Sequence, residues 1–559
     1  MQQADRQLEN SPSSPVLEHN VFHARPRTGS YNSPLQVDRL DRSGSTNEAD
    51  YLSVAAMGEP QKRDAFSHDP SFMTMVQEVT RLSTLSHLPS RSQQDQALPV
   101  ELVISLDSIR DSLQQTCGQG LKQYAEIYGR YLGMLLPLIP ADNWHSVLAL
   151  ASWIDRGAAH LPMDQPACEV MLCFSACLGL INSPEYDTAR DTAQMMAAYC
   201  ARQLPIALHR ASDLAAVSSL SLASLLCLYL FDEASAWSYA GLALTKAISA
   251  GFHRANDQSE VADTTSTAFW SLYTLDRAFA VVLDRPLSVE DGDMTIQLPL
   301  AAPLTHSGQV GVDIRALSSW TVHYSHMFSS WKRNTAAGDD LVTRLATLTC
   351  WYDSCREIEL VGGSISSEEN ASYILTQAIE SQLTCRALVH LFYESVLGHA
   401  QSTSLLHCTE KLEAEVPQFF AAYKAALVAH VLAPTILDLW TIFSTTVTFV
   451  ATRQPKLLGQ LPDAARPAFA ISVATMKVVL ACEDLIRVIS VRNRAVYGLQ
   501  EVLWSFLDAL EKSSQRPAGR APSTDRPNHS ESFNSAVSRC QLPIPRPLKH
   551  LMDLALTAD

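Results

Sequence analysis

Apolar residues recur every three or four positions along most of the middle of this chain, which is the spacing of amphipathic helices. Residues 121–138 follow it with Leu121, Tyr124, Tyr128 and Leu135. Similar stripes occur at residues 168–180, 189–204, 214–231, 237–252, 269–283, 371–393, 419–432 and 468–497. Because the alternation typical of strands is scarce, the pattern predicts an all-α fold, a large multi-helix body over about residues 100–511.

The two flanks of this body differ from it in composition. Half of the 28 prolines lie in residues 1–100 and 513–550, among many Ser, Asn, Gln and Arg residues. Such segments bury too little apolar surface to offset the entropy of ordering. We therefore expect a disordered N-terminal region at 1–95, a helical domain at 96–310, its helical continuation at 311–511, and a disordered linker at 512–545.

The last residues, 546–559, form a short amphipathic tail in this prediction. Leu548, Leu551 and Met552 alternate there with Asp553 and end near Asp559. That mixture resembles an acidic-hydrophobic activation peptide, and chance composition explains it at least as well.

Residues 214–231 contain 18 positions without a charge, the lower limit for crossing a bilayer. The segment also contains four serines and is closely bounded by Asp213 and Asp232. We interpret it as a buried helix of a large α-domain and expect no membrane association.

The charge of the chain limits its partners. The sequence has 42 Lys and Arg against 58 Asp and Glu, a formal net charge of −16, and no three basic residues in succession. Phosphate binding needs clustered cations, so any contact with DNA must be local or made through a partner. Twelve widely spaced cysteines and the absence of an apolar leader at the N-terminus predict an intracellular protein.

The sequence contains few signs of an enzymatic reaction. The common motifs of serine hydrolases, zinc proteases, phosphate loops and dinucleotide folds are missing, so we expect neither an enzyme nor a cofactor. No Cys-x-x-Cys pair offers two thiolates to one zinc ion. We expect Cys168, Cys173 and Cys177, and likewise Cys350 and Cys355, to be buried thiols, and we predict no metal.

The most specific stretch, residues 236–299, begins with a helix over residues 237–252. Six of its residues lie on one face, with small side chains that allow a neighbouring helix to approach: Trp237, Ala240, Leu244, Ala247, Ile248 and Gly251. Gly251 can supply a left-handed cap, and His253 and Arg254 then lie at the negative end of the helix dipole.

A second helix covers residues 269–283, where Asp276 and Arg277 interrupt an otherwise apolar run. If these two charges are buried they require partners, because an unpaired internal charge is costly. Structural ion pairing is the simpler interpretation, and a polar site that faces a ligand is the alternative.

Together the two helices resemble the fungal-specific transcription factor domain, the middle homology region of binuclear zinc-cluster regulators. The family's first helix and its His-Arg ending are matched by Trp237, Gly241, Ala243, Ala247, Gly251, His253 and Arg254. Its second helix and the Gly-Arg-Pro turn are matched by Phe269, Trp270, Tyr273, Asp276, Arg277, Arg285 and Pro286. Asp284 replaces the glycine of that turn, so the resemblance does not establish that the backbone turns here as it does in the family. The resemblance covers about residues 101–303, with residues 124–140 like the opening helix of the domain.

This resemblance implies a transcription regulator in the nucleus, plausibly specific for one pathway such as a metabolite biosynthetic gene cluster. The six-cysteine cluster that reads DNA in such regulators is absent, because Cys117 is the only cysteine before Cys168. DNA would then be contacted indirectly, or through a zinc cluster missing from this sequence. The same resemblance implies that other transcription regulators are partners of this chain and that it forms a homodimer or a heterodimer.

Two other classes of function stay open at this point. One is an enzyme or small-molecule binder with a pocket in the helical body, with Asp276, Arg277 and His253 as first candidates. The other is a cytoplasmic helical scaffold without a genomic role.

Overall fold

Several helices begin at a residue whose side chain caps them. In the computed structural model of this protein, the hydroxyl oxygen of Ser105 accepts a hydrogen bond from the backbone N–H of Ser108 at 3.1 Å. The hydroxyl oxygen of Ser108 in turn accepts a hydrogen bond from the backbone N–H of Ser105. Thr435 and Asp438 form the same reciprocal box at the start of a later helix. Each box satisfies N–H groups that the first helical turn cannot pair. The structure describes residues 104–157, 166–255, 261–299, 314–334, 341–356, 367–397, 402–454, 472–514 and 529–557.

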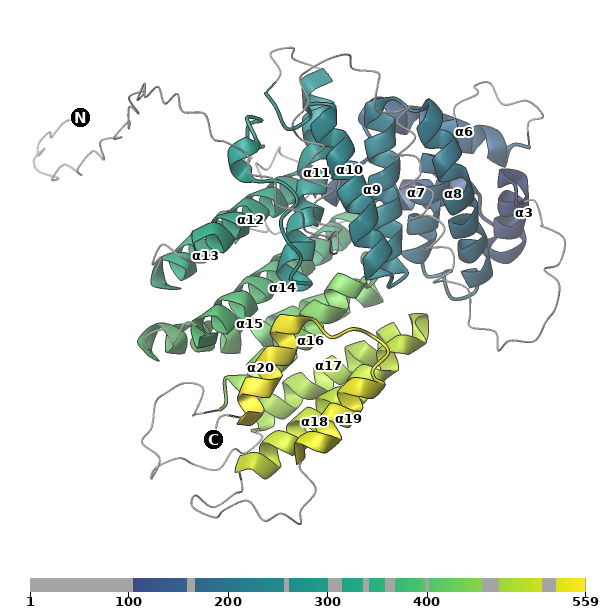
Figure 1. Ribbon diagram of the computed structural model, residues 1–559. Coiled ribbons are helices and arrows are strands. Elements are labelled where there is room, and N and C mark those ends of the chain that lie inside the picture. Colours follow the sequence, from purple (N-terminus) through teal and green to yellow (C-terminus); the bar gives the residue numbers. More distant parts are fainter. Residues whose placement is uncertain are drawn as a thin grey trace, which may run out of the picture. The chain divides into compact units, whose positions relative to one another are not determined.

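The described residues form eighteen α-helices and no strand, so the predicted all-α fold is confirmed. Figure 1 shows them in chain order. The first part comprises α3 (Leu106–Cys117), α4 (Leu121–Arg130), α5 (Leu132–Leu135), α6 (Ala141–Asp155), α7 (Pro166–Ile181), α8 (Arg190–Arg210), α9 (Asp213–Tyr229), α10 (Glu233–Ser249) and α11 (Val261–Val282). A loop with the short 3₁₀ helix η1 (Asp291–Asp293) follows α11.

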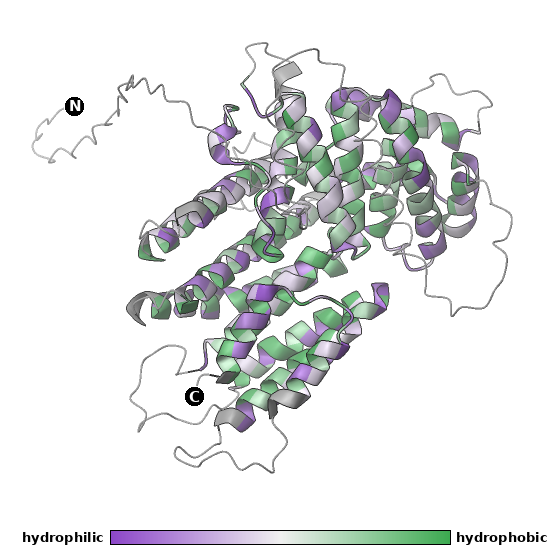
Figure 2. Cartoon of the chain, viewed as in Figure 1, coloured by the Kyte–Doolittle hydropathy of each residue, from purple (hydrophilic) through white to green (hydrophobic). Residues whose placement is uncertain are grey.

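The second part continues the same compact unit, to which all the described helices belong. It comprises α12 (Ile314–Asn334), α13 (Leu341–Arg356), α14 (Ser367–Leu397), α15 (Ser402–Val428), α16 (Ile436–Ala451), α17 (Val473–Arg492), the 3₁₀ helix η3 (Arg494–Val496), α18 (Tyr497–Ser514), α19 (His529–Arg539) and α20 (Arg546–Thr557). Figure 2 shows hydrophobic patches along these helices, interrupted by polar ones, as amphipathic packing requires.

Neighbours in sequence are mostly neighbours in space. The most extensive contacts join α14 with α15, α9 with α10, α4 with α7, and α7 with α8. Short connections favour such antiparallel hairpins of helices. The hydroxyl of Ser224 on α9 donates to the carbonyl oxygen of Ala236 on α10 at 2.7 Å, so a direct hydrogen bond joins these two helices.

Helix α9 is buried almost all round, including its four serines, Ser218, Ser219, Ser221 and Ser224. The interpretation of residues 214–231 as a buried helix is therefore confirmed. In the part of the chain that the structure describes, no helix combines the length and the apolar character needed to cross a bilayer.

Two sequence-based boundaries need correction. Residues 121–138 are two helices, because the chain breaks at Tyr131 between α4 and α5. The predicted disordered linker, 512–545, contains helix α19, whose Phe533 and Ala536 are fully buried. Residues 1–95 and 515–528 lie outside the described residues.

The predicted amphipathic tail is helix α20, which packs against α16 and α18. Leu548, Leu551, Met552 and Ala555 are buried there. The apolar side chains that suggested an activation peptide therefore belong to the core.

The cysteine predictions hold for one cluster and fail in part for the other. Cys168, Cys173 and Cys177 are buried as expected. Cys350 is exposed, because it precedes the buried Trp351 on α13 and so points to another side of the helix. Cys355 lies outside the residues whose side chains are described.

Candidate functional site

The first signature helix, α10, ends as its sequence predicts. Gly251 adopts a φ of 79°, and its N–H donates to the carbonyl oxygen of Ile248 at 3.0 Å. The N–H of Phe252 reaches back to the carbonyl oxygen of Ala247 at 2.9 Å. These two bonds form a Schellman cap, which satisfies carbonyl groups left unpaired at the helix end.

This cap places His253 beside the loop that follows α11. The His253 carbonyl oxygen accepts the N–H groups of Thr295 at 3.1 Å and Ile296 at 3.3 Å. Its buried ring lies 6.5 Å from that of Phe269 and accepts a hydrogen bond from Arg254 Nε at 3.2 Å. Burial, reinforced by the charge of Arg254, lowers the pKa of His253, so the ring stays neutral.

Aromatic residues of α11 hold the same loop from the other side. Phe269, Trp270 and Tyr273 pack edge to face, with ring centroids 5.9 Å and then 5.2 Å apart. The indole N–H of Trp270 donates to the carbonyl oxygen of Gln297 at 3.1 Å. The loop of residues 283–299 is thus fixed at one end by His253 and Trp270.

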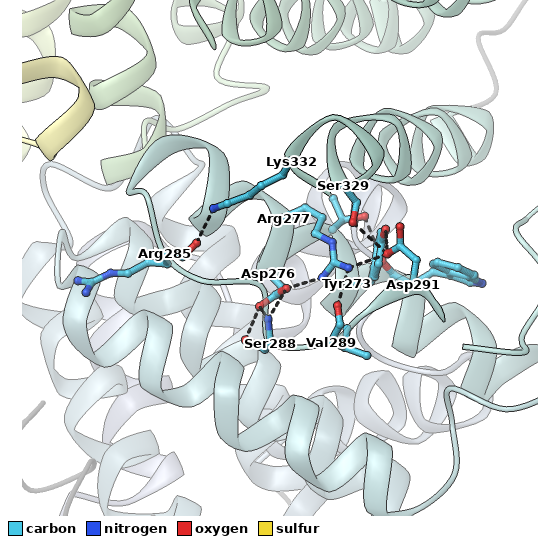
Figure 3. A network of polar contacts seen from close by, with 11 residues as sticks. Tyr273, Asp276, Arg277, Arg285, Ser288, Val289, Asp291, Ser329 and Lys332 are labelled. Carbon is cyan, nitrogen blue, oxygen red and sulfur yellow. Dashed lines mark hydrogen bonds and ion pairs between the residues drawn. The ribbon is translucent and has the colours of Figure 1, made fainter. Parts of the chain in front are cut away.

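At the other end, Asp276 and Arg277 hold the loop through charge (Figure 3). Arg277 is 1% exposed and Asp276 is 2% exposed, and Arg277 Nη1 donates to Asp276 Oδ2 at 2.6 Å. Arg277 Nη2 donates to the carbonyl oxygen of Val289 at 2.7 Å and to Asp291 Oδ1 at 2.8 Å. Asp276 also accepts the N–H and the hydroxyl of Ser288, the latter at 2.5 Å.

Asp291 joins the loop to α12. Its Oδ1 accepts hydrogen bonds from Tyr273 at 2.9 Å and from Ser329 at 3.0 Å, besides that from Arg277. Burial alone would raise the pKa of Asp291, but these donors and the guanidinium charge lower it overall.

The pKa of Arg277 is shifted in the opposite direction, upward. Burial would lower its pKa, and the negative charges of Asp276 and Asp291 raise it instead. The guanidinium also stacks 3.9 Å from the Tyr273 ring centroid. The residues that surround Arg277 therefore keep it charged.

The turn after α11 adopts a backbone that normally favours glycine. Asp284 has a φ of 55°, and the N–H of Arg285 reaches back to the carbonyl oxygen of Phe279 at 3.4 Å. Aspartate is among the few residues that tolerate this left-handed region. Lys332 Nζ on α12 donates to the Arg285 carbonyl oxygen at 3.1 Å, and the Arg285 guanidinium lies 5.0 Å above the Trp237 ring.

Comparison with known proteins matches this part of the chain to one family. Residues 166–330, from α7 into α12, match the family model described as the fungal specific transcription factor domain. Residues 166–330 form a fungal specific transcription factor domain. A transcriptional regulatory protein of Schizosaccharomyces pombe, itself uncharacterized, is 32% identical over 76 residues. That stretch is 13% of this chain and 10% of the relative, so the chain covers only a small part of this relative.

The fungal specific transcription factor domain brings five of the predicted signature residues into one arrangement. We call it the loop clamp: His253, Trp270, Tyr273, Asp276 and Arg277, with the loop residues they hold, Ser288, Val289, Asp291, Thr295, Ile296 and Gln297. The prediction that Asp276 and Arg277 form structural ion pairs is confirmed.

Other signature residues of the domain lie beside the clamp or outside it. Ala247 is fully buried, whereas Arg254 and Pro286 are exposed. Gly241 has open space where a side chain would begin, so it does not serve close helix packing. The family match begins at α7, and the predicted opening helix of the domain, 124–140, lies before it.

The sequence did not reveal which groups Asp276 and Arg277 would meet. Asp291 and Ser288 lie in a loop recognisable only as acidic, and Ser329 lies on α12, which carries no signature residue. Their roles depend on how α11, the loop and α12 fold together. Among the described residues, no three His, Cys, Asp or Glu side chains gather in a way that could hold a metal ion.

Proposed function

We propose that this protein is a transcription regulator that acts in the nucleus, and that its helical body is a regulatory and interaction domain rather than an enzyme. The observation that carries this proposal is the match of residues 166–330 to the fungal specific transcription factor domain. The name of the similar yeast protein, a transcriptional regulatory protein, agrees with it. A pathway-specific role, for example over a metabolite biosynthetic gene cluster, is part of the proposal.

The chemistry of the loop clamp is consistent with a role that is not catalytic. Each charge of the clamp has an opposite partner, since Arg277 pairs with both Asp276 and Asp291. Their hydrogen bonds hold a loop against α11 and α12. This use of charge stabilises one arrangement of the domain, on which partners can dock.

We further propose that DNA is contacted through other regulators, in a homodimer or heterodimer, or through a zinc cluster that these residues do not supply. The net charge of −16 disfavours direct contact with phosphates over a broad surface. Cys117, the first cysteine of the sequence, is followed by buried thiols at Cys168, Cys173 and Cys177.

A tethering experiment tests the regulatory role. The full chain is fused to a heterologous DNA-binding domain, and reporter transcription is compared with that of the DNA-binding domain alone. We expect transcription to change when the chain is attached. Unchanged transcription, together with steady exclusion of a tagged chain from the nucleus, would contradict the proposal.

A second experiment tests how DNA is reached. We expect chromatin immunoprecipitation to show occupancy in cells, while the purified chain gives no tight complex in a gel shift. Tight binding by the pure chain would refute indirect contact, and transcript changes confined to one gene cluster would support the pathway-specific role.

A further inference from the structure

We propose that Ser288 is a phosphorylation site and that a phosphate there opens the loop clamp. The hydroxyl of Ser288 donates to Asp276 Oδ1 at 2.5 Å, and its backbone N–H lies 3.2 Å from Asp276 Oδ2. The carboxylate that receives both donors is almost completely buried. This inference rests on the geometry of the clamp and does not depend on the regulatory role proposed above.

A kinase can reach this serine along the chain. Ser288 is exposed, and so are Pro286 and Glu290 on either side of it. Residues 284–290 have no helical structure that a kinase would have to unwind. Arg285 precedes Ser288 by three positions, and Glu290 follows it by two. The segment therefore contains both a basic and an acidic residue that a serine kinase can recognise.

The reaction is an ordinary phosphoryl transfer from ATP. The Ser288 Oγ attacks the γ-phosphorus, the bond to the leaving ADP breaks, and the hydroxyl proton passes to a base of the kinase. The serine thereby loses the donor that it shares with Asp276 and gains a charge of about −1.5 to −2 at neutral pH.

That charge would lie beside a buried carboxylate. A phosphate next to an aspartate disrupts a structure through like-charge repulsion and through the cost of removing water from both groups. Arg277 cannot compensate easily, because it is already engaged by Asp276, Asp291 and the Val289 carbonyl. Figure 3 shows the Arg285 guanidinium directed away from the Ser288 and Asp276 contact.

We expect the effect to spread along the loop. Ser288 and Val289 are held by adjacent residues of α11, and the Asp291 contacts to Tyr273 and Ser329 lie two residues beyond Val289. Release of Ser288 therefore weakens the neighbouring bonds and exposes the polar face of α11 to partners. The apolar contacts of α9 and α10 contain none of these charges.

Hydrogen exchange measured on the full chain tests the structural consequence. With phosphoserine placed at position 288 by codon suppression, we expect amides in residues 284–298 to exchange about tenfold faster or more, whereas α9 stays unchanged. Ser288→Asp should give a smaller change in the same direction, and Ser288→Ala, which keeps the N–H bond, the smallest. Phosphoserine at Ser538, an exposed residue of α19 whose hydroxyl donates to the Asn534 carbonyl oxygen, is the matched control.

Combining Ser288→Asp with Asp276→Asn separates repulsion from simple damage. The double variant should exchange more slowly in the loop than Ser288→Asp alone, because the two carboxylates no longer face each other. Unchanged or slower exchange in the phosphorylated loop would overturn the proposal, since the phosphate would then be accommodated, for example by Arg285.

The modification itself is tested with purified acid-directed and arginine-directed serine kinases on the full chain. We expect one of them to phosphorylate Ser288, with the site lost in Ser288→Ala and modified faster in Asp276→Asn, where the hydroxyl is less tightly held. Failure of both kinases at Ser288 would refute the site, whatever the outcome of the reporter experiment.

Discussion

Two contacts in the helical body hold its helices in opposite ways. Between α7 and α4, a hydrogen atom is all that fits at Gly179, since a Cβ there would lie 1.8 Å from the Tyr124 carbonyl oxygen. Between α11, its loop and α12, the contact is made by Arg277, Asp276 and Asp291. One contact depends on shape and the other on charge.

The difference lies in what each contact is sensitive to. Close-packed helices respond to every added atom, because protein interiors have few voids. Buried charges respond instead to the loss of a partner or of a proton, since an uncompensated charge is costly away from water. The clamp is therefore the contact that solution conditions or a modification can switch, whereas the α4 and α7 contact is fixed.

Removal of the central cation should have the largest effect on stability. Arg277→Met leaves Asp276 and Asp291 buried without their shared partner, and we expect a loss of about 3–5 kcal/mol in the free energy of unfolding. Urea denaturation followed by circular dichroism measures it. A second signature arginine, Arg254, is the control, because it is exposed and Arg254→Met should change stability by no more than about 0.5 kcal/mol. Equal losses in the two variants would show that the clamp charges do not matter.

A methyl group at the shape-dependent contact should come next. Gly179→Ala forces α4 and α7 apart, and overpacking of this kind costs about 1–3 kcal/mol or more. Gly241→Ala on α10 is the matched control, since it meets open space and should stabilise the helix by up to about 1 kcal/mol. Thermal unfolding distinguishes them, and a neutral Gly179→Ala would mean that α4 and α7 are less closely packed.

The contrast between these two glycines shows what the sequence could predict and what it could not. Apolar spacing predicts most of the helices, and resemblance to a family marks Gly241 although no neighbour approaches it. Gly179 belongs to no motif, and its constraint arises only when α7 meets the backbone of α4. Likewise, the buried charges of Asp276 and Arg277 predict partners, but the choice of Asp291 and Ser329 depends on the folded loop.

Acid should weaken the clamp in two stages. The pKa of His253 is lowered, mainly by burial, from an ordinary value of about 6.5, so its contribution to stability is complete above that pH and is lost as pH falls through the folded value. The pKa of Asp291 is also lowered, from about 3.9, so its contribution disappears only in stronger acid.

Denaturation series between pH 7 and pH 3 measure these stages. We expect His253→Gln to flatten the fall in unfolding free energy that begins below about pH 6.5, and Asp291→Asn to flatten the fall below about pH 4. Gly179→Ala should lower stability by the same amount at every pH, because no charge is involved. A pH-dependent effect of Gly179→Ala would break the distinction between the two contacts.

The turn that leads into the clamp should show the smallest effect. Asp284 adopts the left-handed backbone that glycine enters without strain, and the family resemblance places a glycine at this position. Asp284→Gly removes the strain but gives the unfolded chain more freedom, so we expect a net stabilisation of no more than about 1 kcal/mol. Asp284→Val should destabilise by about 1–2 kcal/mol, because a branched side chain tolerates this backbone poorly. If valine were as stable as aspartate, the turn would have another conformation, and the left-handed backbone could not be what positions Arg285 and the loop beyond it.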